Sequence, residues 1–224
     1  MKKTSRPHVR EGYDLWADTY DNAANPLVSP DRRHTMELLD PLPGQRILDA
    51  ACGTGHYLKA IAGAGSFPVG LDVSGGMLNV ARRQVPNLPL VQADLDRRFP
   101  FCSGLFDVVL SALVSEHLTN LPGFFEEVAR VLVPEGRLIF SAFHPDLAAA
   151  GIEANFELDG VEYRLGAEKH TIEDFVDALS NSGLQTKIVR EFAGDEELVR
   201  QIGRAKKYLG RPMLVLIEGV ASAQ

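Results

Sequence analysis

The feature that most constrains this chain is the stretch 46–55, where an apolar run ends in a carboxylate, Asp49, and then breaks into two glycines, Gly53 and Gly55. This pattern is typical of a buried parallel strand, a tight loop and the start of a helix. Glycine adopts backbone conformations closed to other residues, and it lets a ligand approach the main chain closely. The stretch therefore predicts a ligand site where the strand ends.

A second apolar run, 67–72, ends in Asp72, which follows Gly55 by 17 residues. This is near the roughly 20-residue spacing at which such an acid meets a pair of ribose hydroxyls. A dinucleotide loop would have a third glycine at the position of Leu58. The charge of Asp49 would also repel a pyrophosphate, whereas it suits an ammonium or a sulfonium. The pattern favours a cationic nucleoside.

The stretch 48–55, followed by Leu71-Asp72 and Ala93-Asp94, resembles the class I S-adenosylmethionine-dependent methyltransferases. With the run 106–109, the resemblance spans about residues 10 to 142. It implies an α/β fold, with a Rossmann-like, seven-stranded, mostly parallel sheet, helices on both faces and an antiparallel last strand. It also implies S-adenosyl-L-methionine as cofactor and in-line methyl transfer to an O, N or C nucleophile of a small molecule.

The resemblance implies roles for single residues as well. Asp72 would accept the ribose hydroxyls, and Asp94 would take the adenine amino group beside the Leu95 amide. Asp49 either faces the cofactor or caps the glycine turn, and Met77 either flanks the adenine or belongs to the core. The expected cofactor-binding set is Tyr20, Asp49, Ala51, Gly53, Gly55, Asp72, Val73, Met77, Asp94, Leu95 and Ser111.

Length, charge and cysteine usage narrow the class. A chain of 224 residues suits one methyltransferase domain, 1–224, with one substantial core. A net charge of −7 gives no electrostatic footprint for nucleic acid or an anionic membrane. Two cysteines predict a reducing cytoplasm, and no apolar run is long enough to span a membrane. No metal-ligand motif is present, so we expect no catalytic metal.

Strands and helices alternate along the chain, which favours a mostly parallel sheet. Residues 1–9 are expected to be disordered, within an N-terminal helical cap, 1–40, whose aromatic face includes Tyr20. Expected strands are 46–50, 67–72, 88–93, 105–111, 136–143, 184–192 and 212–220, and expected helices after the cap are 55–64, 75–84, 121–132 and 172–181. Ser74 and Asn120 are expected to start the second and third of these helices, and Thr171 to Asp174 to form a capping box at the last.

The segment 144–170 is longer than most connections in such folds. Apolar and charged residues alternate on both sides of Asp159-Gly160, which predicts a β-hairpin over 155–165, inserted after the fifth strand. We interpret the insertion as a flap that roofs the acceptor pocket. An edge hairpin or a dimer contact is the alternative, so the protein is expected to be a monomer or a homodimer.

His117 and His144 each follow a central strand and are expected at the active edge of the sheet. Histidine titrates near neutral pH and can take a proton from an acceptor, so both are candidate general bases. Alternatively, they only position the acceptor. Two other classes stay open, a non-catalytic nucleoside-binding module and a nicotinamide dehydrogenase.

Overall fold

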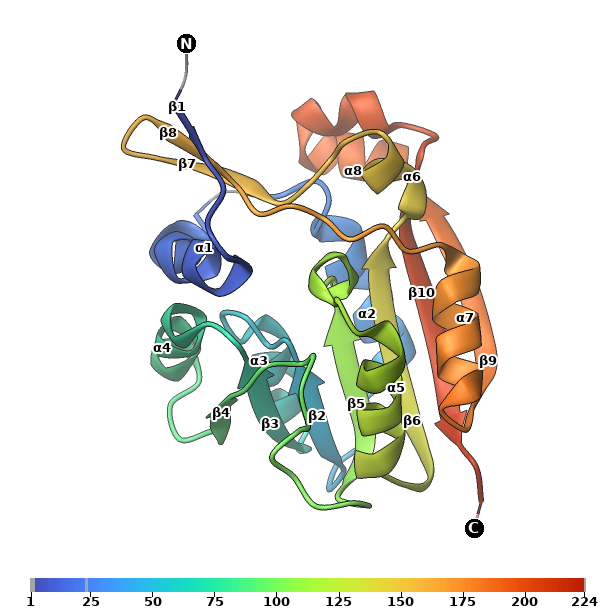
Figure 1. Cartoon of the computed structure of the whole chain (residues 1–224). Helices are drawn as coiled ribbons and strands as arrows, with labels where there is room; N and C mark the ends of the chain where they lie inside the picture. Colours follow the sequence, from blue (N-terminus) through green and yellow to red (C-terminus); the bar gives the residue numbers. More distant parts are fainter. Residues whose placement is uncertain (1–2, 23, 224) are drawn as a thin grey trace.

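The computed structural model describes residues 3–22 and 24–223 and is built on a seven-stranded sheet (Figure 1). The strand order is β4-β3-β2-β5-β6-β10-β9, and β10 runs antiparallel to both of its neighbours. The strands are β2 (Arg46–Ala50), β3 (Phe67–Asp72), β4 (Leu90–Gln92), β5 (Phe106–Ala112), β6 (Leu132–Phe143), β9 (Leu184–Ala193) and β10 (Pro212–Ala221). The predicted fold class is confirmed.

Helices cover both faces of this sheet. On one face, α5 (Leu121–Val131) and α7 (Ile172–Asn181) bury a phenylalanine-rich core that includes Phe124 and Phe175. On the other face, α2 (Ser29–Leu39) and α3 (His56–Gly63) pack against the alternate residues of the same strands. Because both faces are covered, the central strands are apolar on both sides, as their continuous apolar runs predict.

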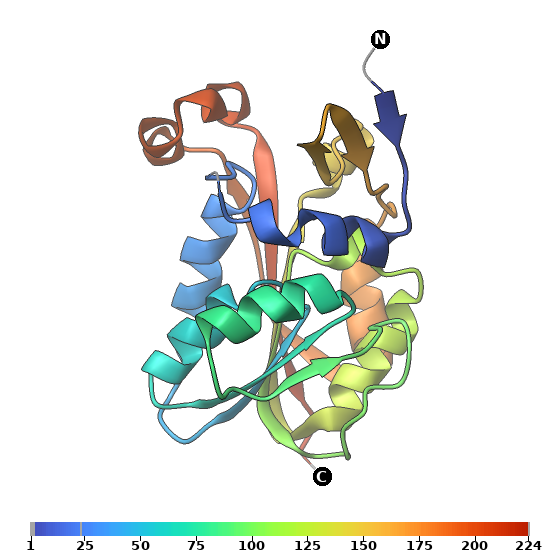
Figure 2. The ribbon, with the colours of Figure 1, turned by 90° about the vertical axis from the view of Figure 1, so that its left-hand side faces the viewer.

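The N-terminal helix lies over the edge of the domain. Figure 2 shows α1 (Val9–Trp16) passing across α4 (Gly75–Gln84), and a short 3-10 helix, Ala17–Thr19, continues it. The predicted capping residues start their helices, since Ser74 accepts the Met77 amide at α4 and Asn120 accepts the Gly123 amide at α5. Thr171 forms the predicted capping box at α7.

The predicted hairpin is present, as β7 (Asn155–Leu158) and β8 (Val161–Arg164) joined at Asp159-Gly160. The expectation of a disordered start is wrong for the described residues. β1 (Lys3–Ser5) pairs in parallel with β8, and the Arg6 guanidinium makes two hydrogen bonds of 3.1 Å to the Glu153 carboxylate. Residues 1–2 lie outside the described residues.

Short helices between the later strands were not predicted. They are α6 (Pro145–Ala149), α8 (Glu196–Gln201) and the 3-10 helices Ser115–His117 and Gly203–Tyr208. A small cluster of Leu147, Leu198 and Tyr208 packs α6 and α8 against the start of β10. In the part of the chain that the structure describes, no helix is both long and apolar enough to cross a membrane.

Two glycines offer a matched test of core packing. A Cβ added at Gly70 would lie 2.7–2.8 Å from atoms of Leu90, Cys52 and Leu58, whereas one at Gly63 meets nothing within 4 Å. Gly70→Ala should therefore lower the free energy of unfolding by about 1–3 kcal/mol. Gly63→Ala, in a helix, should be neutral or stabilising by up to about 1 kcal/mol. Urea unfolding measures both, and equal effects would contradict the packing at Gly70.

Candidate functional site

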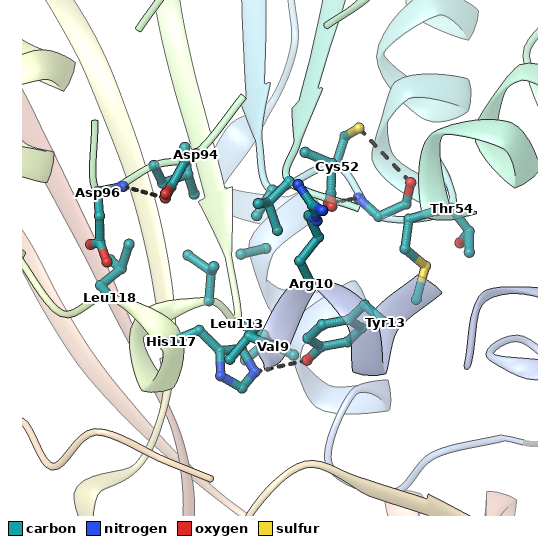
Figure 3. A pocket seen from close by; sticks show the side chains of 18 of the residues that line it. Val9, Arg10, Tyr13, Cys52, Thr54, Asp94, Asp96, Leu113, His117 and Leu118 are labelled. Carbon is teal, nitrogen blue, oxygen red and sulfur yellow. Dashed lines mark hydrogen bonds between the residues drawn. The ribbon is translucent and has the colours of Figure 1, made fainter. Parts of the chain in front are cut away.

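A cavity of about 590 Å³ opens at the carboxyl ends of β2, β3 and β5 (Figure 3). Ligands of open parallel sheets bind at this edge, and the volume suits a small organic ligand. Five segments form its walls: the glycine loop, the residues after β3, the loop 94–97, the segment 112–120 and the N-terminal helices α1 and α2. The N-terminal helices close the side of the cavity that lies beyond the ends of the strands.

The glycine loop has the geometry that its sequence predicts. Gly53 and Gly55 both have positive φ, 52° and 88°. A Cβ at Gly53 would meet nothing within 4 Å, whereas one at Gly55 would lie 3.2 Å from the Ala81 Cβ. Gly53 therefore faces open space in the cavity, and Gly55 lets α3 approach α4. Leu58, at the third-glycine position, is fully buried between these helices.

Asp72 connects the loop to the start of α4. One carboxylate oxygen accepts the Gly53 amide and the other accepts the Ser74 amide, both at 2.8 Å. Burial raises the pKa of Asp72 to about 6, although the two amide bonds counteract this shift. Asp14 of α1 supports the same junction, because its Oδ1 accepts the Ser74 hydroxyl and the Gly76 amide. The sequence analysis did not identify Asp14.

Asp49 is fully buried, and neither of its carboxylate oxygens has a hydrogen-bond partner among the described residues. Burial raises its pKa well above the usual range, and the charges of Asp72 and Asp31 add to this shift. The Ser111 hydroxyl on β5 is likewise buried without a partner in the described chain. These groups lie behind the cavity surface.

The loop after β4 carries two acids, Asp94 and Asp96, that have different hydrogen-bond partners. Asp96 accepts the Thr119 and Asn120 amides, each at 3.0 Å, and holds this loop to the segment before α5. Asp94 accepts the Asp96 amide through Oδ1 and lines the cavity, with the buried Leu95 beside it. Both acids line the cavity, and Asp96 is the one that the segment before α5 holds through hydrogen bonds.

His117 lies at the cavity and is paired with a residue that the sequence analysis did not single out. Its Nε2 lies 2.9 Å from the Tyr13 hydroxyl of α1 (Figure 3), whereas its Nδ1 is buried and has no partner among the described residues. Burial lowers the pKa of His117 to about 4. The imidazole is therefore neutral at pH 7.

His144 is held elsewhere. Its Nδ1 accepts the Asp146 amide at 3.2 Å, which caps α6, and its Nε2 lies 2.9 Å from a Glu191 oxygen. It follows β6 at the expected edge of the sheet, but it does not line the cavity, so of the two candidate bases only His117 lies there.

The hairpin supports the cavity from outside. None of residues 155–165 is among those that line it. Instead, the Phe156 ring stacks on Trp16 of α1, with centroids 4.9 Å apart, and on Tyr163, at 5.0 Å. The hairpin thus contacts the helix that carries Tyr13, and the expectation that its residues roof the pocket directly is wrong.

The structure brings most of the expected residues together and leaves four outside the lining. Those that line the cavity are Tyr20, Ala51, Gly53, Asp72, Val73, Met77, Asp94, Leu95 and His117. Those that do not are Asp49, Gly55, Ser111 and His144. The exposed Arg10 and the half-buried Arg32 also line it, and neither arginine carries a sequence signal that would have identified it. Within the described residues, no group of three or more His, Cys, Asp or Glu side chains could hold a metal ion.

Glu116, beside His117, gives a test of these electrostatics. Burial raises its pKa to about 8, so the folded protein binds this proton more tightly than the unfolded chain does. Stability should therefore fall as the pH rises from the unfolded pKa, near 4.3, towards 8. Glu116→Gln should remove this loss, up to about 1.4 kcal/mol per pH unit.

Urea unfolding of both proteins at several pH values between 5 and 9 measures the effect. The free energy of unfolding of Glu116→Gln, relative to that of the wild type, should increase with pH up to about pH 8, and the difference should stay constant above that pH. Glu126→Gln, at an exposed position on α5, is the control and should follow the wild-type curve. Parallel curves for all three proteins would contradict a buried, protonated Glu116.

Comparison with known proteins agrees with this geometry. Residues 48–140 match a family model described as a methyltransferase domain. A malonyl-[acyl-carrier protein] O-methyltransferase from Methylovorus sp. (strain MP688) is 37% identical over 154 residues, which cover 63% of this chain and 51% of that protein. A demethylmenaquinone methyltransferase from Beutenbergia cavernae is 34% identical over 135 residues, which cover 60% of this chain and 55% of that protein. The chain thus spans about half the length of these relatives.

A solved structure extends the likeness over nearly the whole fold. The crystal structure of an S-adenosylmethionine-dependent methyltransferase from Mesorhizobium loti has a TM-score of 0.72 and 24% identity, and the match covers 89% of this chain and 99% of that chain. Residues 48–140 thus match a methyltransferase domain, the relatives that match over 135–154 residues are methyltransferases, and the solved structure shares the fold of this chain.

Proposed function

We propose that this protein transfers a methyl group from S-adenosylmethionine to a small-molecule acceptor. The observation that carries the proposal is the cavity itself, in which the open face of Gly53 and the carboxylate of Asp72 share one wall and an apolar region lies opposite. The solved structure from Mesorhizobium loti is an S-adenosylmethionine-dependent methyltransferase, which supports this cofactor. Two relatives are named for malonyl-[acyl-carrier protein] and for demethylmenaquinone, which supports an acceptor other than nucleic acid.

The residues present suit a ligand with a positive charge. Asp49 is a buried carboxylate without a partner in the described chain, and its raised pKa reflects its burial and the charges of Asp72 and Asp31. A sulfonium or an ammonium near this end of the cavity would relieve the repulsion and favour the ionised forms. Asp49 would act in this way from behind the cavity surface, through its charge and not through direct contact.

We assign the nucleoside end of the cofactor to the walls after β3 and β4. Asp72 keeps acceptor capacity after its two amide bonds, because a carboxylate has about four lone-pair sites, and it would accept the ribose hydroxyls. Asp94 and the Leu95 amide would meet the adenine edge, and Val73 and Met77 would flank its ring. Tyr20 would place its hydroxyl near the methionine carboxylate, and burial raises the pKa of Tyr20 to about 12, so this hydroxyl stays protonated.

The acceptor end is formed by α1 and the segment after β5. Val9, Leu113 and Leu118 supply apolar surface, and Tyr13 and His117 supply the polar groups there. When bound, the cofactor supplies an activated methyl group on sulfur. The task of this chain is to exclude water and hold the acceptor atom in line with that group, which requires proximity and alignment more than acid or base.

Ligand binding tests the cofactor assignment. Calorimetry should show binding of S-adenosylmethionine and S-adenosylhomocysteine, and Asp72→Ala should weaken both by about 1–3 kcal/mol, since charge-assisted hydrogen bonds are lost. Asp18→Ala removes an acid whose side chain is 82% exposed and should leave both affinities unchanged. Binding of NAD alone would favour the dehydrogenase class, and unchanged affinity in folded Asp72→Ala would remove Asp72 from the site.

Turnover separates an enzyme from a binding module. We expect S-adenosylhomocysteine to form with at least one member of a panel of phenols, carboxylates, amines and thiols. If the cofactor binds tightly and no member of the panel raises its conversion above the acceptor-free rate, the binding-module class is favoured.

We further propose that the hairpin serves the acceptor end by holding α1. Replacing 155–165 with a short Gly-Ser link removes the Phe156 stack on Trp16 and the partner of β1. Cofactor affinity should be retained and methyl transfer lost, because α1 would no longer hold its place over the acceptor. Loss of both in a folded variant would assign the hairpin to the cofactor site, and loss of dimerisation alone would indicate an interface.

A further inference from the structure

The Tyr13–His117 pair fixes where a proton lies in the acceptor end of the cavity. The two groups come from α1 and from the 3-10 helix after β5, and their rings meet edge to face, with centroids 5.3 Å apart. The 2.9 Å distance from the Tyr13 hydroxyl to His117 Nε2 is a hydrogen bond in which either atom could be the donor. The surroundings of the imidazole decide between the two directions.

The other ring nitrogen, Nδ1, is buried and has no partner among the described residues. A neutral imidazole carries one proton, on Nδ1 or on Nε2. A proton on Nδ1 would leave a buried N–H without an acceptor, and orphaned N–H groups are rarer in folded proteins than under-satisfied acceptors. The proton therefore lies on Nε2, where the Tyr13 oxygen accepts it.

The nearby acid does not change this assignment. The closest Glu116 oxygen is 4.0 Å from Nε2, which is too long for a hydrogen bond. Its raised pKa, about 8, also keeps Glu116 uncharged at pH 7, so it does not draw a second proton onto the imidazole. Burial raises the pKa of Tyr13 well above 10, and Tyr20, Glu116 and Asp72 add to this, so the phenol keeps its own proton.

From this geometry we infer that the Tyr13 hydroxyl is a hydrogen-bond donor to the methyl acceptor, oriented by His117 behind it. The bond from Nε2 occupies one lone pair of the phenol oxygen and leaves the O–H to the cavity that Tyr13 lines. Tyr13 is then the residue in contact with the acceptor, and His117 is a positioning residue that acts through it. No proton is transferred by the pair.

The inference rests on the proposed methyl transfer and narrows its acceptor class. A fixed O–H donor needs a lone pair on the acceptor, and carbonyl and carboxylate oxygens supply one in the plane of an sp² centre. We therefore expect an acceptor whose nucleophilic atom is, or adjoins, such an oxygen, on an apolar body that suits Val9, Leu113 and Leu118. Simple amines and thiols lack this oxygen.

The tautomer can be measured without any acceptor. In protein with ¹⁵N-labelled histidine and bound S-adenosylhomocysteine, the His117 ring signals at pH 7 should show a protonated Nε2 and an unprotonated Nδ1. His117→Gln serves to assign the signals. A proton on Nδ1 would mean that Tyr13 donates to the imidazole, and this would overturn the proposal even if methyl transfer is observed.

Variants test the role in turnover, with carboxylic acids and 1,3-dicarbonyl compounds as one arm of the acceptor panel and amines and thiols as the other. Tyr13→Phe should lower kcat/KM by about 10–100-fold for the oxygen-bearing arm, the range for a hydrogen bond to a charged or polarised group. Its affinity for S-adenosylhomocysteine should stay within about 2-fold of wild type. Tyr208→Phe, which removes a hydroxyl in the separate cluster beside α6 and α8, outside the cavity lining, is the matched control and should leave kcat/KM unchanged.

The positioning role of His117 is tested with variants that keep or lose an N–H donor at this position. Gln keeps an N–H that can reach the Tyr13 oxygen and should retain more activity than Leu, which has no donor. The pH profile should also keep its shape in His117→Gln, because no base is removed. Equal activity of the His117→Gln and His117→Leu variants would contradict the proposal. It would also be contradicted if amines were methylated faster than the oxygen-bearing acceptors and Tyr13→Phe did not change kcat/KM.

Discussion

The cavity depends on the two hydrogen bonds that the Asp72 carboxylate accepts, from the Gly53 amide and from the Ser74 amide. These bonds fix the glycine loop after β2 against the first turn of α4, so the ends of two neighbouring strands are held in one geometry. Asp14 extends the junction to α1 through Ser74 and Gly76. A single carboxylate thus positions the floor of the cavity, and the N-terminal wall is attached to the same point.

The same region contains three buried acids whose ionised forms are disfavoured by burial. Asp31, Asp49 and Asp72 are all buried, and burial is the first cause of the raised pKa of each. Asp31 is compensated by the Tyr57 and Thr35 hydroxyls, at 2.6 and 2.7 Å, whereas Asp49 has no such partner in the described chain. A buried carboxyl group without a hydrogen-bond partner is costly to a fold, so its presence beside a cavity favours a cationic ligand that would stabilise its ionised form.

Sequence reasoning succeeded where a long apolar run or a side-chain cap encodes the structure by itself. The central strands, the Ser74 and Thr171 caps and the Asp159-Gly160 turn are of this kind. Sequence reasoning failed where a tertiary contact determines the local structure. The three polar residues of β1 form a strand only because the edge of β8 accepts them, and α8 is a short helix held by a local cluster. Similarly, nothing in the sequence separates His117 from His144, since both follow a strand and only packing brings Tyr13 to one and Glu191 to the other.

The family match covers the walls of the cavity unequally. The glycine loop, Asp72 and Asp94 all lie within residues 48–140, the range that the family model matches. The wall that carries Tyr13 lies outside this range, as do the β1 strand and the hairpin that contact it. A family match therefore bears on the cofactor end and is silent on α1. In the proposed function the acceptor binds against α1, so Tyr13 and Val9 would select it in a region that the family model does not cover.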